Sequence, residues 1–229
     1  MACRSSSPTP DPLLDFLQKL LRRGGSPRSP RAVALSEIRS SFEAAAGDEQ
    51  HFPSTIDPRI YHVQLIARYF GDMNSRLALD AGSGKGRFAR VLQDLNPQAR
   101  IVTLDLALAM LAHAKAPLLP CCGTLTQYPF PDHTFDFVYA TESLEHAVDI
   151  ERAVAELTRV LKPGGKLVII DKNIEHWGRL ETPHWETWFD RRNMEALLAR
   201  QCRHVSSDFI SYWEDVPPDG LFLAWKAEK

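Results

Sequence analysis

The sequence is poor in cysteine and lacks any long hydrophobic run. Its four cysteines are Cys3, Cys121, Cys122 and Cys202, and their spacing forms no paired zinc-binding CxxC motifs. We therefore expect no metal site and no disulfide framework, as is typical of a chain from a reducing cytoplasm. No apolar stretch approaches the roughly 20 residues needed to cross a bilayer, so we expect no membrane partner and a cytoplasmic location.

An excess of positive charge is also missing. The chain carries 27 Lys and Arg residues against 29 Asp and Glu residues, a formal net charge of −2. This balance gives no general attraction to phosphate backbones, so we do not expect nucleic acid as a partner. Hydrophobic residues make up 44% of the chain, enough for a globular protein with a sizeable core.

The residue pattern divides the chain into three parts. Residues 1–31 are rich in Ser, Pro and Arg, which predicts a disordered tail with one short amphipathic helix from about residue 12 to 23. Residues 32–74 predict a helical extension or lid over the site, with helices near 32–46 and 58–69. The third part, residues 75–229, alternates apolar strands with amphipathic helices and is the predicted catalytic domain.

The third part predicts an α/β fold with a doubly wound, mostly parallel seven-stranded sheet. Strands are expected at 76–80, 101–104, 118–122, 135–140, 166–170, 204–212 and 221–226. Helices are expected at 87–95, 106–115, 150–161 and 185–201. Strands that alternate with helices at this spacing form βαβ units, and such units build parallel sheets.

A glycine-rich loop with the sequence DAGSGKG, residues 80–86, joins the first strand to the following helix. Glycines let the chain turn tightly and let a ligand approach the main chain. Open α/β sheets bind ligands at this end of their strands. The loop is not a P-loop, because Gly86 stands where Ser or Thr is needed. It is not a dinucleotide fingerprint either, because Arg87 replaces the third glycine.

Several segments, taken in order, resemble class I S-adenosylmethionine-dependent methyltransferases, and the type 11 group most closely. They are the glycine loop, YPFPDHTFDFV at 128–138, TESLEH at 141–146 and VLKPGGKLVI at 160–169. The resemblance covers roughly residues 75–172. It implies the Rossmann-like methyltransferase fold, S-adenosyl-L-methionine as the cofactor, and a small-molecule methyl acceptor.

The resemblance also implies which residues hold the cofactor. Asp80 supplies negative charge near the cofactor's ammonium group. Asp105, at the end of the second strand, accepts hydrogen bonds from the ribose hydroxyls. The family's usual Asp for the adenine amino group is absent near Thr124, whose hydroxyl substitutes for it, or else the backbone of Leu125 does. The full predicted set is Asp80, Ala81, Gly82, Ser83, Gly84, Gly86, Asp105, Leu106, Thr124, Leu125 and Thr141.

The implied reaction is an in-line attack of the acceptor on the sulfonium methyl group. Much of the catalysis can come from positioning the reactants, and a base is needed only when the acceptor must lose a proton. His146 and Glu142 are the candidate catalytic residues, since a histidine titrates near neutral pH. His146 can equally pack or cap the next helix. The aromatic residues at 184–189 predict either a wall of the acceptor pocket or core packing of the last helix.

Other functions remain open on the sequence alone. A module of the same fold can bind the cofactor, or activate a partner, without transferring a methyl group. A nicotinamide oxidoreductase is disfavoured by Arg87. An enzyme that methylates protein or RNA is disfavoured because the chain has neither an Asn-Pro-Pro-Tyr type motif nor a basic stripe.

Overall fold

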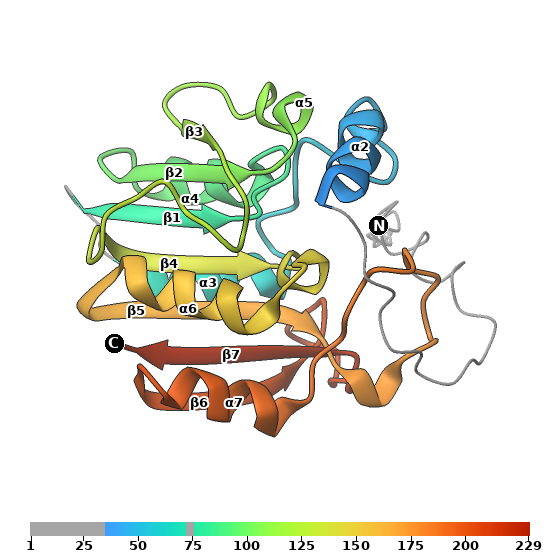
Figure 1. Cartoon of the computed structure of the whole chain (residues 1–229), viewed down its shortest axis with the longest axis vertical. Helices are drawn as coiled ribbons and strands as arrows, with labels where there is room; N and C mark the ends of the chain where they lie inside the picture. The colour runs from blue at the N-terminus through green and yellow to red at the C-terminus, as the bar shows by residue number, and fades with distance from the viewer. Residues whose placement is uncertain (1–34, 72–75) are drawn as a thin grey trace, which may run out of the picture.

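The computed structural model describes residues 35–71 and 76–229. The predicted tail at 1–31 and its short helix lie outside the described residues. Figure 1 shows one sheet with helices on both of its faces. The strands are β1 (Leu77–Ala81), β2 (Arg100–Asp105), β3 (Leu119–Cys122), β4 (Phe135–Thr141), β5 (Leu161–Lys172), β6 (Arg203–Ile210) and β7 (Phe222–Glu228).

The strand order is β3-β2-β1-β4-β5-β7-β6. The first five strands pair in parallel, and β7 runs antiparallel to both β5 and β6. The predicted α/β fold with a mostly parallel seven-stranded sheet is therefore confirmed. The strand order changes direction between β1 and β4, because β2 and β3 lie on one side of β1 while β4 and the later strands lie on its other side.

The helices form two layers around the sheet. They are α2 (Leu35–Ala45), α3 (Tyr61–Phe70), α4 (Arg87–Leu95), α5 (Leu108–Leu111), α6 (Ile150–Val160) and α7 (Arg191–Ala199), with short 3₁₀ turns η1 (Leu144–His146) and η2 (Ile174–His176). In Figure 1, α3 and α4 lie behind the sheet while α6 and α7 lie in front of it. α2 stands apart from both layers, at the edge where the parallel strands end.

Two hydrophobic clusters follow from the two-residue period of the strands. Phe137 and Tyr139 pack on the side of α3 and α4, whereas Val138 and Ala140 pack on the side of α6 and α7. Because both faces of the central strands are buried, these strands are apolar at nearly every position. That continuous apolar run is what makes β4 recognisable in the sequence.

The prediction of helix over residues 185–190 was wrong. α7 begins at Arg191, and the Asp190 side chain caps it by accepting a hydrogen bond from the Asn193 amide. The preceding segment is bonded elsewhere: the Thr187 amide donates to the Glu145 carbonyl, and the Phe189 amide donates to the Lys172 carbonyl. These long-range bonds use the backbone donors that a helix would have needed.

Two other boundaries also differ from prediction. α5 covers a single turn, where helix was predicted over 106–115. The Asp105 carboxylate accepts the Ala107 amide and the Glu43 carboxylate accepts the Leu108 amide, and these bonds fix where the helix begins. β5 begins at Leu161, earlier than predicted, because this residue already pairs with Phe135. None of the helices in the described ranges has the length and apolar character needed to cross a bilayer.

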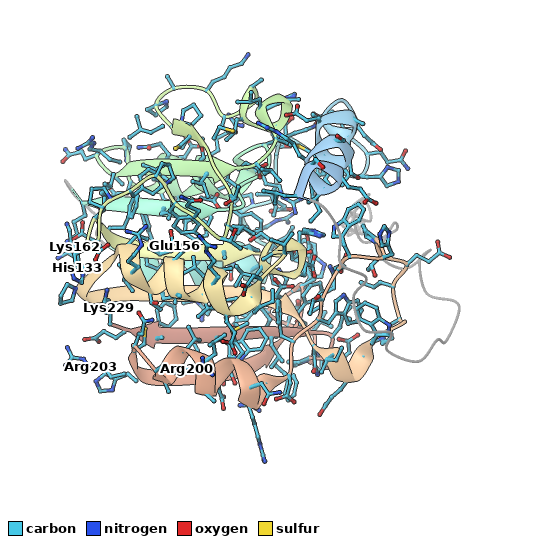
Figure 2. The ribbon with its side chains drawn as sticks, viewed as in Figure 1. His133, Glu156, Lys162, Arg200, Arg203 and Lys229 are labelled. Atoms are coloured by element: carbon cyan, nitrogen blue, oxygen red, sulfur yellow. The ribbon has the colours of Figure 1, made fainter. Side chains whose placement is uncertain are left out.

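Charged side chains hold together the edge of the sheet where the parallel strands begin. His133, Lys162 and Lys229 lie at this edge, away from α2 (Figure 2). Lys229 Nζ donates to the Thr158 carbonyl at 2.6 Å, and Lys162 Nζ lies 2.9 Å from Asp136 Oδ2. The candidate site lies at the opposite edge.

Candidate functional site

A cavity of about 330 Å³ opens at the carboxyl ends of β1, β2, β4 and β5. It includes the point where the strand order reverses, which is where open α/β sheets bind their ligands. The predicted site residues that line it are Asp80, Gly82, Ser83, Gly84, Asp105, Leu106, Leu125, Thr141, Glu142 and His146. The other predicted residues, Ala81, Gly86 and Thr124, are not part of its lining.

The glycine loop is fixed against its neighbours by main-chain contacts. The amides of Gly82 and Ser83 both donate to the Leu104 carbonyl, at 2.8 and 2.9 Å. Ser143 Oγ donates to the Ala81 carbonyl at 2.8 Å. Gly82 has a φ of 74°, and a Cβ at this position would lie 2.5 Å from the Ser143 Cβ. Only glycine therefore lets the loops after β1 and β4 approach this closely.

Asp105 joins the glycine loop to the end of β2. Its Oδ2 accepts the Gly84 amide and its Oδ1 accepts the Ala107 amide, both at 2.8 Å. Burial raises the pKa of this carboxyl, and the hydrogen bonds from the amides oppose that effect. Two backbone amides thus hold the carboxylate at the cavity wall in a fixed orientation.

Asp80 is a second buried carboxyl on the same wall. Burial raises its pKa to about 7; the Tyr139 hydroxyl opposes this change, and the negative charge of nearby Asp105 adds to it. A cation bound beside these two carboxyls would favour their ionised forms. The glycine-loop end of the cavity is therefore suited to a ligand with positive charge.

Several polar groups at this end have no hydrogen-bond partner among the described residues. The hydroxyls of Ser83 and Thr141 are buried and make no hydrogen bond with the described residues. A Cβ built on Gly84 would meet nothing within 4 Å, so the main chain is open to a ligand there. An unsatisfied buried polar group costs about 1–3 kcal/mol, and a polar ligand would recover that cost. These features fit a nucleoside cofactor with an amino-acid end.

Glu142, a predicted catalytic residue, is held as an ion. Its Oε1 lies 3.6 Å from Nδ1 of His62, a fully buried ring of α3. The His62 ring is packed between Tyr212 and Phe222, at centroid distances of 5.0 and 4.9 Å. Burial alone would raise the pKa of Glu142, but His62 outweighs it and the pKa falls to about 2. So acidic a group is a weak base at neutral pH.

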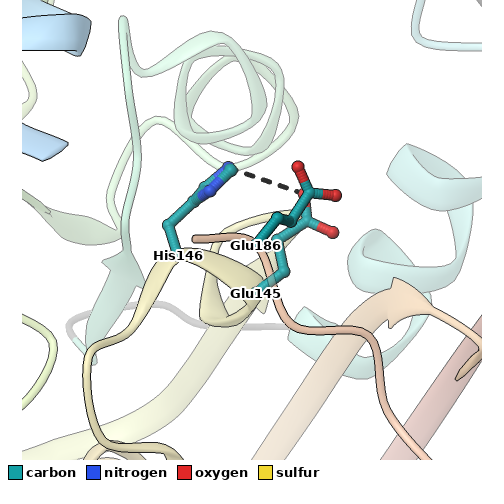
Figure 3. A group of neighbouring side chains, drawn as sticks. All are labelled: Glu145, His146 and Glu186. Carbon is teal, nitrogen blue, oxygen red and sulfur yellow. Dashed lines mark ion pairs between the residues drawn. The ribbon is translucent and has the colours of Figure 1, made fainter. Parts of the chain in front are cut away.

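His146, the other predicted catalytic residue, lies beside an aromatic ring of α2. Its imidazole meets Phe42 edge-on at a centroid distance of 5.0 Å. Burial lowers the pKa of His146 to about 4, so the ring is neutral at physiological pH. Its Nε2 lies 3.6 Å from Glu145 Oε1, the contact that is dashed in Figure 3.

A buried lysine pairs with two carboxylates next to His146. Lys172 Nζ lies 2.5 Å from Glu145 Oε1 and 2.9 Å from Glu186 Oε1. Trp188 Nε1 donates to the same Glu186 oxygen at 2.7 Å. Burial would lower the pKa of Lys172, but the two glutamates outweigh it and raise it well above the ordinary value. We name these three ionic residues, Glu145, Lys172 and Glu186, the lysine cluster.

The lysine cluster also bears on metal binding. Glu145, His146 and Glu186 bring one donor atom each within 4.8 Å of one another, as Figure 3 shows. A divalent cation there would have to compete with the Lys172 ammonium, which already lies against both carboxylates. We therefore interpret these carboxylates as partners of Lys172 and not as metal ligands.

α2 forms the roof of the cavity through Leu35, Ile38 and Phe42. The Glu43 carboxylate fixes this helix to α5, accepting the amides of Leu108 and Ala109 at 2.8 and 2.9 Å. The sequence pointed to a lid over residues 32–74, but not to Glu43, because its partners lie 65 residues away in the chain. A carboxylate at a helix N-terminus is recognisable only once the two helices are placed together.

The aromatic segment at 184–189 divides between the cavity and the core. Trp185 lines the cavity, whereas Trp188 and Phe189 are buried in the core. Glu186, between them, lines the cavity as well and was missed as a site residue. Its neighbours Trp185 and Trp188 were the available signal, since aromatic residues so often enclose a ligand pocket.

Comparison with known proteins relates the chain to methyltransferases. The family model described as "Methyltransferase domain" matches residues 79–169. The demethylmenaquinone methyltransferase of Renibacterium salmoninarum is 31% identical over 160 residues, which is 66% of each chain. In three other curated relatives the matched segment spans only about half of the relative, 47 to 49%.

Two solved structures show the same fold. The [4+2]-cyclase SpnF superposes with a TM-score of 0.71 at 16% identity, covering 88% of this chain and 99% of that one. The phosphoethanolamine N-methyltransferase 2 of Haemonchus contortus, solved in complex with S-adenosyl-L-methionine, has a TM-score of 0.65 at 15% identity. That match covers 82% of this chain and 60% of the nematode enzyme.

Proposed function

Because the chain belongs to the class I S-adenosylmethionine-dependent methyltransferases, with a type 11 domain, we propose that it transfers a methyl group from S-adenosyl-L-methionine to a small-molecule acceptor. One observation carries the proposal. A single cavity brings the glycine loop, Asp80 and Asp105 together with an apolar wall. Such a cavity can hold a polar cofactor and an apolar acceptor side by side.

The chain's own groups divide the binding of the cofactor among them. Asp105 accepts hydrogen bonds from the ribose hydroxyls, and Asp80 places negative charge near the ammonium group. The Ser83 and Thr141 hydroxyls, which lack partners in the part of the chain that the structure describes, offer further hydrogen bonds. When bound, the cofactor supplies an electrophilic methyl group on a positively charged sulfur. The protein's main task is then to orient the acceptor and exclude water.

The acceptor half of the cavity favours a planar, largely apolar molecule. Phe42 and Phe52 from the N-terminal part and Trp185 from the segment after β5 line this half, together with Leu180. Aromatic walls of this kind bind flat rings well. The relative from Renibacterium salmoninarum is named as a demethylmenaquinone methyltransferase. We infer a planar, largely apolar acceptor.

Isothermal titration with S-adenosyl-L-methionine tests the cofactor assignment. The wild-type chain should bind it and should not bind NAD. Asp105→Asn should weaken binding by about 1.5–3 kcal/mol, the scale of hydrogen bonds to a charged group. Asp94→Asn, at an exposed position of α4, is the matched control. Equal affinities for the two variants would remove Asp105 from the site.

A second candidate is a cofactor-binding module that transfers no methyl group. The fold shared with SpnF, which is named as a [4+2]-cyclase, supports it because one architecture can serve unrelated reactions. A labelled-methyl assay against quinols, phenols and metabolite extracts separates the two candidates. Transfer of label to an acceptor supports the methyltransferase, whereas tight cofactor binding without any transfer supports the module.

A further inference from the structure

The lysine cluster leaves one carboxylate oxygen available to a ligand. Glu186 Oε1 accepts hydrogen bonds from both Lys172 Nζ and Trp188 Nε1, at 2.9 and 2.7 Å. The second oxygen, Oε2, accepts none from the described residues, and the side chain lines the cavity. Glu186 is thus held in one orientation by two donors while its other oxygen remains free to meet an acceptor.

The surroundings of Glu186 are arranged to keep it in place. Its amide donates to the Pro183 carbonyl, and the next amide, of Thr187, donates to the Glu145 carbonyl at 2.8 Å. The segment after β5 is therefore fixed to η1, the turn that carries His146. His146 in turn contacts Phe42, so Glu186 lies close to the aromatic wall of the cavity.

We propose that Glu186 accepts the proton of a neutral hydroxyl-bearing acceptor, a phenol or an enol, in the apolar half of the cavity. This proposal rests on the proposed function and names its substrate class. The O–H bond of the acceptor breaks, its proton passes to Glu186 Oε2, and the electron pair stays on the acceptor. That pair forms the new bond to the methyl carbon, while the C–S electron pair stays on sulfur as a neutral thioether.

The charges around Glu186 suit a carboxylate that accepts a proton from a neutral donor. Lys172 lies 2.9 Å from Glu186 and favours its ionised form. Two carboxylates surround this one ammonium, so the cluster would disfavour an acceptor that arrives as an anion, whereas a neutral hydroxyl can donate to Oε2. His146 is neutral and adds no charge. The second oxygen of Glu145 also has no partner among the described residues, but it is buried.

The acidity of Glu186 fits the same role. Burial and the charge of Glu145 raise its pKa to about 7, against the opposing effect of Lys172. A group with a pKa near the working pH is the most effective proton acceptor. Glu142, whose pKa is about 2, is far less suited to this step. Asp80 has a similar pKa and an oxygen without a partner among the described residues, but it lies at the glycine-loop end of the cavity, whereas Glu186 lies beside the aromatic wall.

Probe binding tests the proposal without turnover. Dissociation constants of 4-methylphenol, which is neutral at pH 7.5, and of 4-methylanisole would be measured by isothermal titration on the chain saturated with S-adenosylhomocysteine. Glu186→Gln should weaken the binding of 4-methylphenol about tenfold or more and leave that of 4-methylanisole within about twofold, because only the phenol donates to the carboxylate. Glu175→Gln, at an exposed position of η2, is the matched control. Glu186→Asp keeps the charge but moves it away from the acceptor, so it should weaken the binding of the phenol alone. This variant replaces the glutamine variant if the latter does not fold.

Three other outcomes of the probe measurements would overturn the proposal. Equal weakening of both probes would mean that Glu186 only supports the wall, and no weakening would mean that it does not meet the acceptor. A larger loss of affinity for 4-methylbenzylamine than for 4-methylphenol would assign the site to amines. Failure of the wild-type chain to bind S-adenosyl-L-methionine would refute the proposed function instead, and that titration is independent of the phenol measurement.

Discussion

Replacing Lys172 with methionine removes the cation from the lysine cluster while keeping most of the side-chain volume. The Lys172 side chain is 8% exposed, and those of Glu145 and Glu186 are 2% and 3% exposed. Removing one partner of a buried ion pair costs about 3–5 kcal/mol, because a charge is left without compensation. In a domain of this size each kcal/mol lowers Tm by about 2–4 °C, so the variant should melt roughly 6–20 °C below the wild type.

The same loss should depend on pH. Burial and the charge of Glu145 already raise the folded-state pKa of Glu186 above the unfolded value of about 4.3, and loss of Lys172 removes the charge that opposes this. A group with a raised folded pKa contributes stability that is fully present below the unfolded pKa and is lost as pH rises through the folded pKa. The deficit of the variant should therefore be largest at pH 7 and above, and should shrink as the pH falls toward about 5.

Urea unfolding followed by circular dichroism at pH 5 and pH 7.5 measures both effects. Lys162→Met is the matched control, because Lys162 pairs with Asp136 at 2.9 Å but is 41% exposed, and such pairs contribute about 0–1 kcal/mol. Adding Glu186→Gln to Lys172→Met should restore part of the stability by removing one uncompensated charge. A loss no larger than that of the control, or one that is equal at both pH values, would refute the buried ion-pair reasoning.

Three further predictions follow from single contacts. Gly82→Ala should lose about 1–3 kcal/mol of unfolding free energy in urea, because φ is positive and the new Cβ would strike Ser143. Glu43→Gln should speed amide hydrogen exchange at Leu108 several-fold, since the carboxylate that caps α5 loses its charge. Cofactor affinity, measured by calorimetry, should increase by up to about tenfold for each unit by which the pH is raised toward 7, and should then level off. The reason is that a bound cation favours ionised Asp80, whose pKa is about 7 in the free chain. An affinity that does not change between pH 6 and pH 8 would contradict this.

The parts of the fold that the sequence predicts well are those with a local cause. β4 is a run of apolar residues between polar turns, and its position was predicted to within one residue. The glycine loop and Asp105 could be placed together because consecutive parallel strands end at the same edge of a sheet. Both inferences need only the order of the elements and the two-residue period of a strand.

The parts that the sequence misses depend on contacts between distant residues. Residues 185–190 have a composition compatible with helix, but their amides bond to carbonyls near Glu145 and Lys172. The role of Glu186 depends on the same contacts, because it faces the cavity only when this segment is extended across η1. The helix prediction and the missed residue therefore have one physical origin, the docking of the segment after β5 onto the loop after β4.

The charges along the cavity bear on the charge that donor and acceptor carry when they bind. At the glycine loop, Asp80 and Asp105 form an acidic end whose raised pKa values make it receptive to a cation. At the other end, Lys172 lies against both Glu145 and Glu186, so its positive charge is already compensated. Neither end of the cavity therefore favours an acceptor that is already an anion. An acceptor that enters as a neutral hydroxyl compound avoids this repulsion, and under our proposal it loses its proton to Glu186, whose carboxylate is neutralised by the same transfer.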